Sequence, residues 1–382
     1  MKVPHFNVAI VGSGITGLST AYHLHKAGTE KLALITSPQS VCTTRNSANI
    51  VAGGTTDNFT RISNAHGLDF AKELWDFSNS GFDKVLQFCK EHKVPHNQNR
   101  RIRLIVSKDE LVESEKAVRE LRSVGLDGAL YKPDQFPLLT GFQKRVLAVQ
   151  DEGERGAWVE TKHFLQTLRE HCSLLEIPTP LRSFEKTKEG IVLNLNDGSE
   201  ITAEFLVLAC HTQISHFLPN LKEVLVCYAD QWSHVRVPDL EAHHDGLVFS
   251  AHHGYEWGLI VHKNLHFGGG RYLRKMAGIG ATEASVQDNI TEHLREQLQK
   301  TFVWASHAEF AHTTGLVEIW PCDELPVVGP MYGEDRVLLA TGYMGTGFSM
   351  GFHAGLCLSD IIRTGKSSSL PRRLWPERLR SL

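Results

Sequence analysis

Hydrophobic positions near the start of the chain change from a strand pattern to a helix pattern and back. Apolar runs at 8–11 and 32–35 read as strands, because their apolar residues are continuous. Between them, 17–27 has an apolar residue at every third or fourth position and reads as a helix, with Gly28 as a natural stop. This order predicts a strand–helix–strand unit.

The rest of the chain mixes helical and strand patterns without an internal repeat. A polar, glycine-rich stretch at 42–60 has no periodicity and is predicted to be a functional loop. The Asp-Gly pair at 197–198 indicates a hairpin turn before 204–209, which reads as a buried parallel strand. From 224 to 266 aromatic and β-branched residues dominate, which predicts a second, mostly antiparallel sheet in an α/β fold. Further predicted helices are 66–91, 108–124, 160–172 and 287–299, and further predicted strands are 102–106 and 191–195.

Three glycines after the first apolar run form a Gly-x-Gly-x-x-Gly sequence. Gly12 allows the tight strand-to-helix turn, Gly14 lets a pyrophosphate approach the backbone, and Gly17 lets the helix pack closely on the strand. The phosphates would lie at the helix N-terminus, where free N–H groups favour negative charge. The motif predicts a dinucleotide site; the alternative is a glycine-rich turn that binds nothing.

The end of the second predicted strand departs from the dinucleotide-binding pattern. An Asp or Glu is expected there to bind the ribose hydroxyls, and this chain has Thr36 and Ser37 instead. A neutral hydroxyl bonds to ribose more weakly than a carboxylate does. The missing acid argues against NAD more than against FAD, because FAD can be held along its whole length.

The bulk properties are those of an ordinary globular enzyme. The chain has 382 residues and a formal net charge of −3, so it offers no general basic surface for nucleic acid or an anionic membrane. The seven cysteines are scattered without zinc spacing, and no signal-like stretch precedes the first strand, so we expect a cytoplasmic protein. Histidine pairs at 243–244 and 252–253 lack a recognisable ligand frame, and no metal site is predicted.

An uncharged segment at 337–359 has a glycine at every fourth position: Gly347, Gly351 and Gly355. It is long enough to span a membrane, but it is too polar and too often interrupted by glycine. We therefore predict a strand, a glycine loop and a tightly packed helix. Such an element offers a second set of close backbone N–H donors, which a protein that wraps FAD end to end needs and an NAD dehydrogenase does not.

With these motifs the chain resembles the FAD-dependent amino-acid and amine oxidases of the D-amino-acid-oxidase superfamily, which include glycine oxidase, monomeric sarcosine oxidase and γ-glutamylputrescine oxidase. The resemblance covers nearly the whole length. It is most specific in the N-terminal glycine motif and in 315–365, and it also touches 151–168, 206–210 and the Phe-Gly-Gly sequence at 267–269.

The resemblance implies an extended flavin whose ring lies between two domains. A Rossmann-like β/α FAD-binding domain would comprise 1–75, 150–220 and 325–382, and a sheet-based substrate domain would comprise 76–149 and 221–324. The cofactor residues would be Gly12, Gly14 and Gly17 at the pyrophosphate, Thr36 and Ser37 at the ribose, Ser47 and Asn49 in the polar loop, and Gly342, Gly345, Thr346, Gly347 and Phe348 at the ring.

Two further positions depart from the family pattern. Covalent members carry a cysteine several residues before the place of Asp323, where this chain has Leu316, so FAD is expected to be non-covalent. Sarcosine-type members place a lysine two residues after the last loop glycine, and this chain has Ser349 there.

The implied reaction is hydride transfer to flavin from the carbon next to an amine nitrogen. Water would then hydrolyse the imine, and O₂ or another acceptor would take the electrons. For each candidate contact, the alternative is a role in the core or at the surface. The candidates are Tyr228, Tyr255, Trp257 and His262 for the substrate, with Arg271 or Arg61 as the anchor of a carboxylate.

Two other functions fit the same motifs. One is a flavin dehydrogenase that acts on a 2-hydroxy acid or an amine and passes electrons to a partner protein. The other is a non-catalytic FAD-binding subunit of a larger assembly. Formation of peroxide separates an oxidase from a dehydrogenase, and bleaching of the flavin by any substrate excludes the non-catalytic subunit. The oligomeric state is not predicted.

The first prediction concerns Gly14, where the absence of a side chain lets the pyrophosphate approach the backbone. Gly14→Val should abolish FAD binding and leave soluble protein, because the clash is with the ligand. The measurement is the flavin content of the purified variant. A full complement of FAD would show that the phosphates bind elsewhere.

Overall fold

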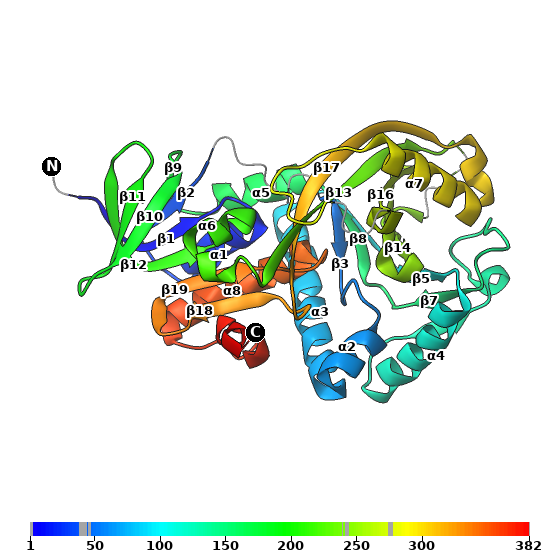
Figure 1. Ribbon diagram of the computed structural model, residues 1–382, viewed down its shortest axis with the longest axis horizontal. Coiled ribbons are helices and arrows are strands. Elements are labelled where there is room, and N and C mark those ends of the chain that lie inside the picture. The colour runs from blue at the N-terminus through cyan, green and yellow to red at the C-terminus, as the bar shows by residue number, and fades with distance from the viewer. Residues whose placement is uncertain are drawn as a thin grey trace.

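The computed structural model describes residues 3–37, 44, 47–238, 240, 244–273 and 278–381. One eight-stranded sheet lies at the left of Figure 1 and a second lies at the right, and the long helix α3 (Leu68–His92) runs between them. A three-stranded sheet of β3 (Ile50–Ala52), β8 (Gly156–Val159) and β4 (His96–Asn99) lies near the centre.

The first sheet has the predicted strand–helix–strand unit at its centre. β1 (His5–Val11) pairs in parallel with β2 (Leu32–Ile35) and with β12 (Glu200–Leu208), and α1 (Ile15–Lys26) joins β1 to β2. The strand order is β10-β11-β12-β1-β2-β9, and β19 pairs with β12 and β18. The remaining strands are β9 (Leu174–Ile177), β10 (Leu181–Lys186), β11 (Ile191–Leu195), β18 (Val327–Met331) and β19 (Glu334–Thr341).

The second sheet is mostly antiparallel, as predicted. Its order is β17-β13-β16-β15-β14-β5-β7-β6, and β14 with β5 is its parallel pair. Apolar residues of α7 (Asp288–Thr301) pack on one face of this sheet. The strands are β17 (Glu309–Pro321), β13 (Leu225–Arg236), β16 (Asn264–Gly269), β15 (Glu256–Val261), β14 (Val248–Ala251), β5 (Arg101–Ile105), β7 (Ala148–Asp151) and β6 (Ala129–Tyr131).

The segment at 337–359 forms the predicted strand, glycine loop and packed helix, namely β19 and α8 (Gly347–Thr364). Glycines let α8 approach its neighbours. A Cβ on Gly355 would lie 2.7 Å from the backbone nitrogen of Thr20 in α1, and Gly81 of α3 makes a similarly close approach from the other side. No helix in the described part of the chain is long and apolar enough to cross a membrane.

The loop predicted at 42–60 is more ordered than its sequence indicated. It contains β3, and α2 (Phe59–His66) begins before its end, because the Asn58 side chain accepts a hydrogen bond from the Phe59 N–H and caps the helix. Residues 42, 43, 45 and 46 lie outside the described residues. The other helices are α4 (Lys108–Ser123), α5 (Thr161–Glu170) and α6 (Ile214–Phe217).

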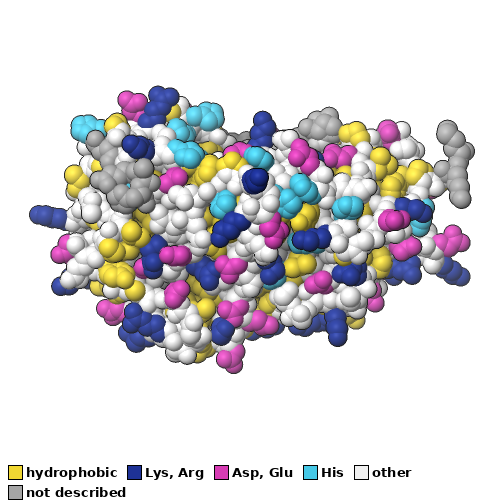
Figure 2. Space-filling model, turned by 180° about the vertical axis from the view of Figure 1, so that it is seen from behind, with side chains coloured by type: hydrophobic (Ala, Val, Ile, Leu, Met, Phe, Trp, Pro, Cys, Tyr) yellow, Lys and Arg dark blue, Asp and Glu magenta, His cyan; other side chains and the backbone are white. Residues whose placement is uncertain are grey.

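The proposed division into domains stays a prediction. Its boundary at 75–76 falls inside α3, which packs on α8 beside the first sheet. On the face shown in Figure 2, basic and acidic side chains are interspersed, in keeping with the small net charge of −3.

Candidate active site

The turn between β1 and α1 is built on glycines. Gly12 has a φ of +112°, and a Cβ at this residue would overlap the carbonyl of Ala209. A Cβ on Gly17 would overlap the carbonyl of Gly12, so the helix can lie this close to the turn only with glycine there. Gly14 is the N-cap, supplies no side-chain cap, and is followed by a first turn without acidic residues. This helix start fits the phosphates of a dinucleotide.

A hydroxyl that the sequence did not single out also meets this turn. The Ile15 N–H donates to Thr44 Oγ1 at 3.2 Å. Thr44 lies in the polar loop, and Ser47 Oγ donates to its carbonyl at 2.8 Å. Neither glycine spacing nor periodicity could identify Thr44, because its contact with α1 depends on how the loop folds back.

The predicted polar residues of the nucleotide half are held by the backbone. Thr36 lies just after β2, its N–H donates to Ile177 O at 3.0 Å, and both Thr36 and Ser37 are half-buried. Asn49 has a φ of +62°, and its side chain accepts a hydrogen bond from Thr161 N at the start of α5. The roles of these residues toward a cofactor stay predictions.

The loop between β19 and α8 comes close to the first glycine turn. Gly342 and Gly345 have left-handed φ values of +73° and +82°. Thr346 is the N-cap of α8, and its hydroxyl donates to the Tyr343 carbonyl at 2.8 Å. The Tyr343 hydroxyl is in turn 3.0 Å from Thr16 Oγ1 in the first turn of α1. The two glycine turns therefore lie side by side, at the N-termini of two packed helices.

Phe348 and Ser349 follow at the start of α8. Phe348 is buried and meets the ring of Phe164 of α5 edge-on. Ser349 Oγ donates to Ala52 O at 2.6 Å and so ties α8 to β3. At the position of the lysine of sarcosine-type proteins, this chain therefore has a structural hydrogen bond.

Four of the predicted substrate residues lie at one end of the second sheet. Arg271 follows β16, and its guanidinium lies 4.6 Å from the ring centre of Tyr228 and 5.4 Å from that of Tyr255. A guanidinium nitrogen of Arg271 donates to the Tyr228 hydroxyl at 2.7 Å. Trp257, the second residue of β15, lies beside them and donates its indole N–H to Asp230 at 3.3 Å.

Three further residues complete this cluster and were not predicted. Trp320 lies 4.7 Å from the Arg271 guanidinium, and Glu318 accepts hydrogen bonds from Tyr228 and from Trp320. Asp230 accepts from Trp257. The pairing of β13 with β17 aligns Tyr228 with Glu318 across 90 residues of sequence, and a pattern within one strand does not reveal such a contact. We call Tyr228, Asp230, Tyr255, Trp257, Arg271, Glu318 and Trp320 the aromatic–charged cluster.

Burial and neighbouring charge shift the pKa values in this cluster. Burial raises the pKa of Asp230 to about 6, the negative charge of Glu318 adds to the rise, and Arg271 opposes it. Burial alone would lower the pKa of Arg271, but Tyr228, Asp230 and Glu318 outweigh it, so that pKa is raised. Arg271 therefore stays a cation.

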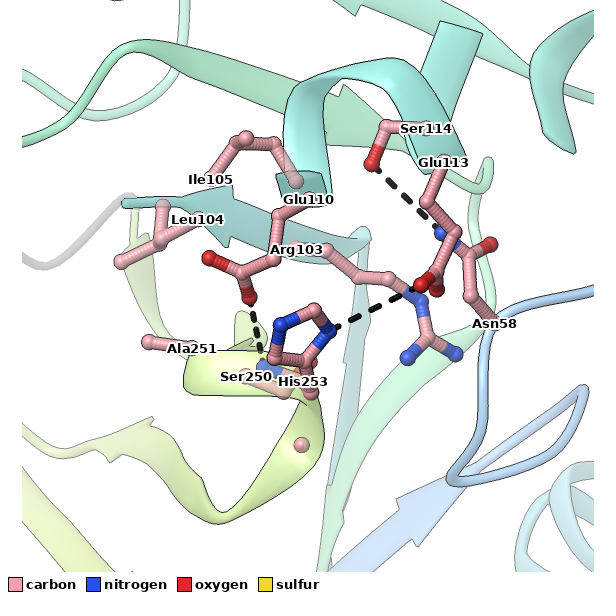
Figure 3. A pocket seen from close by; sticks show the side chains of 11 residues that line it. Asn58, Arg103, Leu104, Ile105, Glu110, Glu113, Ser114, Ser250, Ala251 and His253 are labelled. Carbon is pink, nitrogen blue, oxygen red and sulfur yellow. Dashed lines mark hydrogen bonds and ion pairs between the residues drawn. The ribbon is translucent and has the colours of Figure 1, made fainter. Parts of the chain in front are cut away.

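Arg61 lies on α2, beside the cavity shown in Figure 3, and its charge is largely neutralised. It donates to Glu113 at 3.1 Å, lies 3.5 Å from Asp57, and is in hydrogen-bond contact with His253 Nδ1. Glu113 and His253 line the cavity, in which Glu110 also accepts a hydrogen bond from the His253 backbone N–H at 2.5 Å. Burial alone would lower the pKa of Arg61, but the negative charges of Glu113 and Asp57 and the proximity of Tyr255 outweigh it, so that pKa is raised.

His262 lies apart from the other predicted residues. It is in the turn between β15 and β16, with its side chain 64% exposed and 3.8 Å from Asp245. Tyr255 precedes β15 and His262 follows it, so at a rise of about 3.3 Å per residue they are roughly 23 Å apart. The structure does not bring His262 to the cluster. Among the described residues no group of His, Cys, Asp and Glu could hold a metal ion, and His243 lies outside them.

The raised pKa of Asp230 predicts a specific dependence of stability on pH. The folded-state value of about 6 lies above the ordinary value of 3.8, so Asp230 stabilises the fold below about pH 4 and that contribution is lost as the pH rises through about 6. Asp230→Asn should therefore gain stability relative to the wild type between about pH 4 and pH 7, measured by denaturant unfolding. Asp197→Asn, in an exposed turn, should show a flat difference over that range; a flat difference for both variants would contradict the shift.

Comparisons with known proteins agree with this geometry. One relative, 4-methylaminobutanoate oxidase (formaldehyde-forming) of Paenarthrobacter nicotinovorans, is 28% identical over 266 residues; the match covers 63% of this chain but only 29% of that protein. Glycine oxidase from Geobacillus kaustophilus has the same fold, with a TM-score of 0.78, 14% identity and coverage of 97% and 98% of the two chains. L-Proline dehydrogenase from P. horikoshii gives a TM-score of 0.79, 16% identity and coverage of 100% and 99%.

The sequence also matches the DAO family, described as FAD dependent oxidoreductase, over residues 7–361. That match spans both glycine turns and all of the aromatic–charged cluster. The chain therefore belongs to the DAO family of FAD-dependent oxidoreductases.

Proposed function

We propose that this protein uses non-covalent FAD to oxidise the C–N bond of an amine or amino acid that carries a carboxylate. The observation that carries the proposal is the position of the second glycine turn relative to the sheet. A Cβ on Gly342 would lie 2.5 Å from Cγ of Pro321, the residue that directly follows Trp320 of the cluster. The cluster thus adjoins the turn that would hold the flavin ring.

The residues present fit FAD along its length. Both helix starts are glycine turns, the first turn of neither helix carries an acidic residue, and only glycine fits Gly12 and Gly17. When bound, FAD supplies the hydride acceptor. The proposed contacts are Gly12, Gly14 and Gly17 for the pyrophosphate, Thr36 and Ser37 for the ribose, Ser47 and Asn49 in the polar loop, and Gly342, Gly345, Thr346, Gly347 and Phe348 for the ring.

Non-covalent binding is supported by the residue at the place of the family's linking cysteine. Leu316 is there, 4% exposed, and pairs with Asp230 across β17 and β13. An aliphatic side chain cannot form a bond to the flavin. Acid precipitation should therefore leave the flavin in solution.

Arg271 is the proposed anchor for a substrate carboxylate. A guanidinium has five N–H donors, and the Tyr228 hydroxyl is its acceptor among the described residues, so donors remain for a bidentate contact. The rings of Tyr228 and Trp320 flank the guanidinium and fix its plane.

Arg61 is the weaker of the two arginine candidates. Glu113 and Asp57 pair directly with the Arg61 guanidinium, whereas Arg271 donates to a neutral hydroxyl. The carboxylates near Arg271 accept their hydrogen bonds from Tyr228, Trp257 and Trp320, so the Arg271 donors stay available. Tyr255, which is 39% exposed, lies close enough to both arginines to interact with their charges and is the proposed rim of the site.

The substrate class draws further support from the named relatives. 4-Methylaminobutanoate, glycine and L-proline all combine a nitrogen bonded to carbon with a carboxylate. These names do not agree on the electron acceptor, because they include both oxidases and a dehydrogenase. We propose O₂ as the acceptor and a cytoplasmic location, the latter supported by the six free cysteines of the described residues.

The decisive experiment is an anaerobic screen of amines and amino acids that follows bleaching of the flavin. Carboxylate-bearing amines should bleach it, and readmission of O₂ should restore the colour with one peroxide formed per flavin. Bleaching without peroxide would indicate a dehydrogenase that needs another acceptor. Bleaching by 2-hydroxy acids alone, or by no compound, would contradict amine oxidation.

The carboxylate anchor can be tested with a bleaching substrate. Arg271→Ala should raise KM by roughly one to two orders of magnitude, because a charge-assisted hydrogen-bonded pair of roughly 1.5–3 kcal/mol is lost. Arg61→Ala serves as the comparison and should raise KM much less, because its charge is already neutralised. An effect of Arg271→Ala confined to kcat, or a larger KM effect at Arg61, would contradict the assignment.

A further inference from the structure

Two buried arginine side chains donate hydrogen bonds to the backbone of the loop 53–57, which connects β3 to α2. Arg101 donates to the carbonyls of Gly53 and Thr55. Arg103 donates to the carbonyls of Thr55, Thr56 and Asp57, at distances of 2.7–3.0 Å. The arginine side chains are about 6% exposed. All four carbonyls lie in one short loop, so the two guanidiniums together determine its path.

One buried carboxylate orients both arginines. Glu152 Oε2 lies 3.0 Å from Nε of Arg101, and its other oxygen is paired with Nε of Arg103. Gln150 donates to Glu152 at 3.1 Å and to Asn58, the N-cap of α2, at 3.0 Å. Arg103 and Asn58 both line the cavity shown in Figure 3. Arg101 and Arg103 belong to β5, and Glu152 directly follows β7, so the second sheet holds the loop through charged hydrogen bonds and ion pairs.

The excess of positive charge in this set favours carbonyl ligands. Two guanidiniums face one carboxylate, and burial together with the charge of Arg103 lowers the pKa of Arg101 to about 10, although Glu152 opposes that shift. Carbonyl oxygens carry partial negative charge, so the loop backbone provides the compensation that a second carboxylate would otherwise supply.

The same loop contacts the second glycine turn through Thr56. The Thr56 hydroxyl donates to the carbonyl of Met344 at 2.5 Å, and a Cβ on Gly345 would lie 2.8 Å from Thr56 Oγ1. Met344 has a left-handed φ of +50° and is 4% exposed, so the hydrogen bond from Thr56 reaches the backbone of a buried turn. The neighbouring backbone N–H groups of the turn share that peptide geometry.

We propose that Arg101, Arg103 and Glu152 are positioning residues for the flavin ring, and that they act through Thr56. The arginines fix the carbonyls on either side of Thr56, its hydroxyl fixes Met344, and Met344 sets the backbone of 342–347. This inference rests on the proposed function, in which that turn contacts FAD. The substrate-binding sheet thereby sets the position of the cofactor-binding loop.

The closing experiment compares Thr56→Val, which removes the hydroxyl at nearly constant size, with Thr56→Ser, which keeps it. Apoprotein is titrated with FAD, and the melting temperature of the apoprotein is measured separately. Thr56→Val should weaken FAD binding about five- to tenfold, on the scale of one hydrogen bond, and should lower the apoprotein melting temperature by only about a few degrees. Thr56→Ser should bind FAD within about twofold of the wild type.

A double-mutant cycle tests the link to the arginines. Arg103→Lys keeps the charge but loses the forked donors, and combined with Thr56→Val it should weaken FAD binding little more than the stronger single change. Additive losses would mean that Arg103 does not act through Thr56. If Arg103→Lys fails to fold, Arg101→Lys takes its place in the cycle, because Arg101 donates to the same loop.

Gly347→Val separates failure of this inference from failure of the proposed function. Gly347 begins α8, and a Cβ there would meet Tyr343 at an ordinary 3.5 Å, so the change obstructs a ligand rather than the fold. Lost FAD binding in Gly347→Val with unchanged binding in Thr56→Val would overturn the positioning role alone. Unchanged binding in both would overturn the placement of FAD at this turn and the inference with it. An equal loss of FAD affinity and apoprotein stability in both Thr56 variants would reduce Thr56 to a structural residue and overturn the inference.

Discussion

The close packing of α1 on α8 is the constraint on which both glycine turns depend. Packed helices are normally about 8–10 Å apart, with side chains between them. Here the absence of side chains at Gly351 and Gly355 lets α8 press on Thr16, Ser19 and Thr20 of α1. Each helix begins at a glycine turn, so the contact brings residues 12–17 and 342–347 together from opposite ends of the chain. A β/α unit thereby acquires a second set of backbone donors without a second Rossmann motif.

The second sheet carries two groups of buried charged side chains, one with an excess of carboxylates and one with an excess of guanidiniums. In the aromatic–charged cluster two carboxylates, Asp230 and Glu318, face the single guanidinium of Arg271, and the excess of negative charge contributes to the raised pKa of Asp230. Under the loop 53–57 the ratio is reversed, and the pKa of Arg101 is lowered. Buried charges are costly unless paired and hydrogen-bonded, so each group is completed by aromatic N–H and O–H donors or by backbone carbonyls.

The features that depend on residues close together in sequence could be predicted from the sequence. The turn at Gly12, the Asp-Gly hairpin, the strand–helix–strand unit and the glycine-spaced helix α8 all follow from residues close together in sequence. The glycines near Phe348 could also be found, because positive φ and close helix packing both require glycine. The family resemblance added the expectation that both ends of the chain contact one extended FAD.

The register in which distant strands pair could not be predicted from patterns within single strands. Glu318 joins Tyr228 only because β13 and β17 pair in one register, and a shift by one residue would turn either side chain to the opposite face. His262 and Tyr255 are seven residues apart and look equally suitable, but they flank β15 at opposite ends, so only Tyr255 can lie near Arg271. The short strand β3 was hidden in a polar stretch, because three residues show no period.

Ser349 lies where the family resemblance suggested a lysine, and it provides a hydroxyl without a charge. The hydroxyl of Ser349 is used to bind the Ala52 carbonyl, the last residue of β3. The next residues along the chain form the loop 53–57, whose carbonyls receive Arg101 and Arg103. A cation at this position would be buried, because Ser349 is 1% exposed and its backbone carbonyl lies against Gly81 of α3. The positive charge beside this loop therefore comes from the second sheet, where the partner carboxylate Glu152 and the loop carbonyls can compensate it.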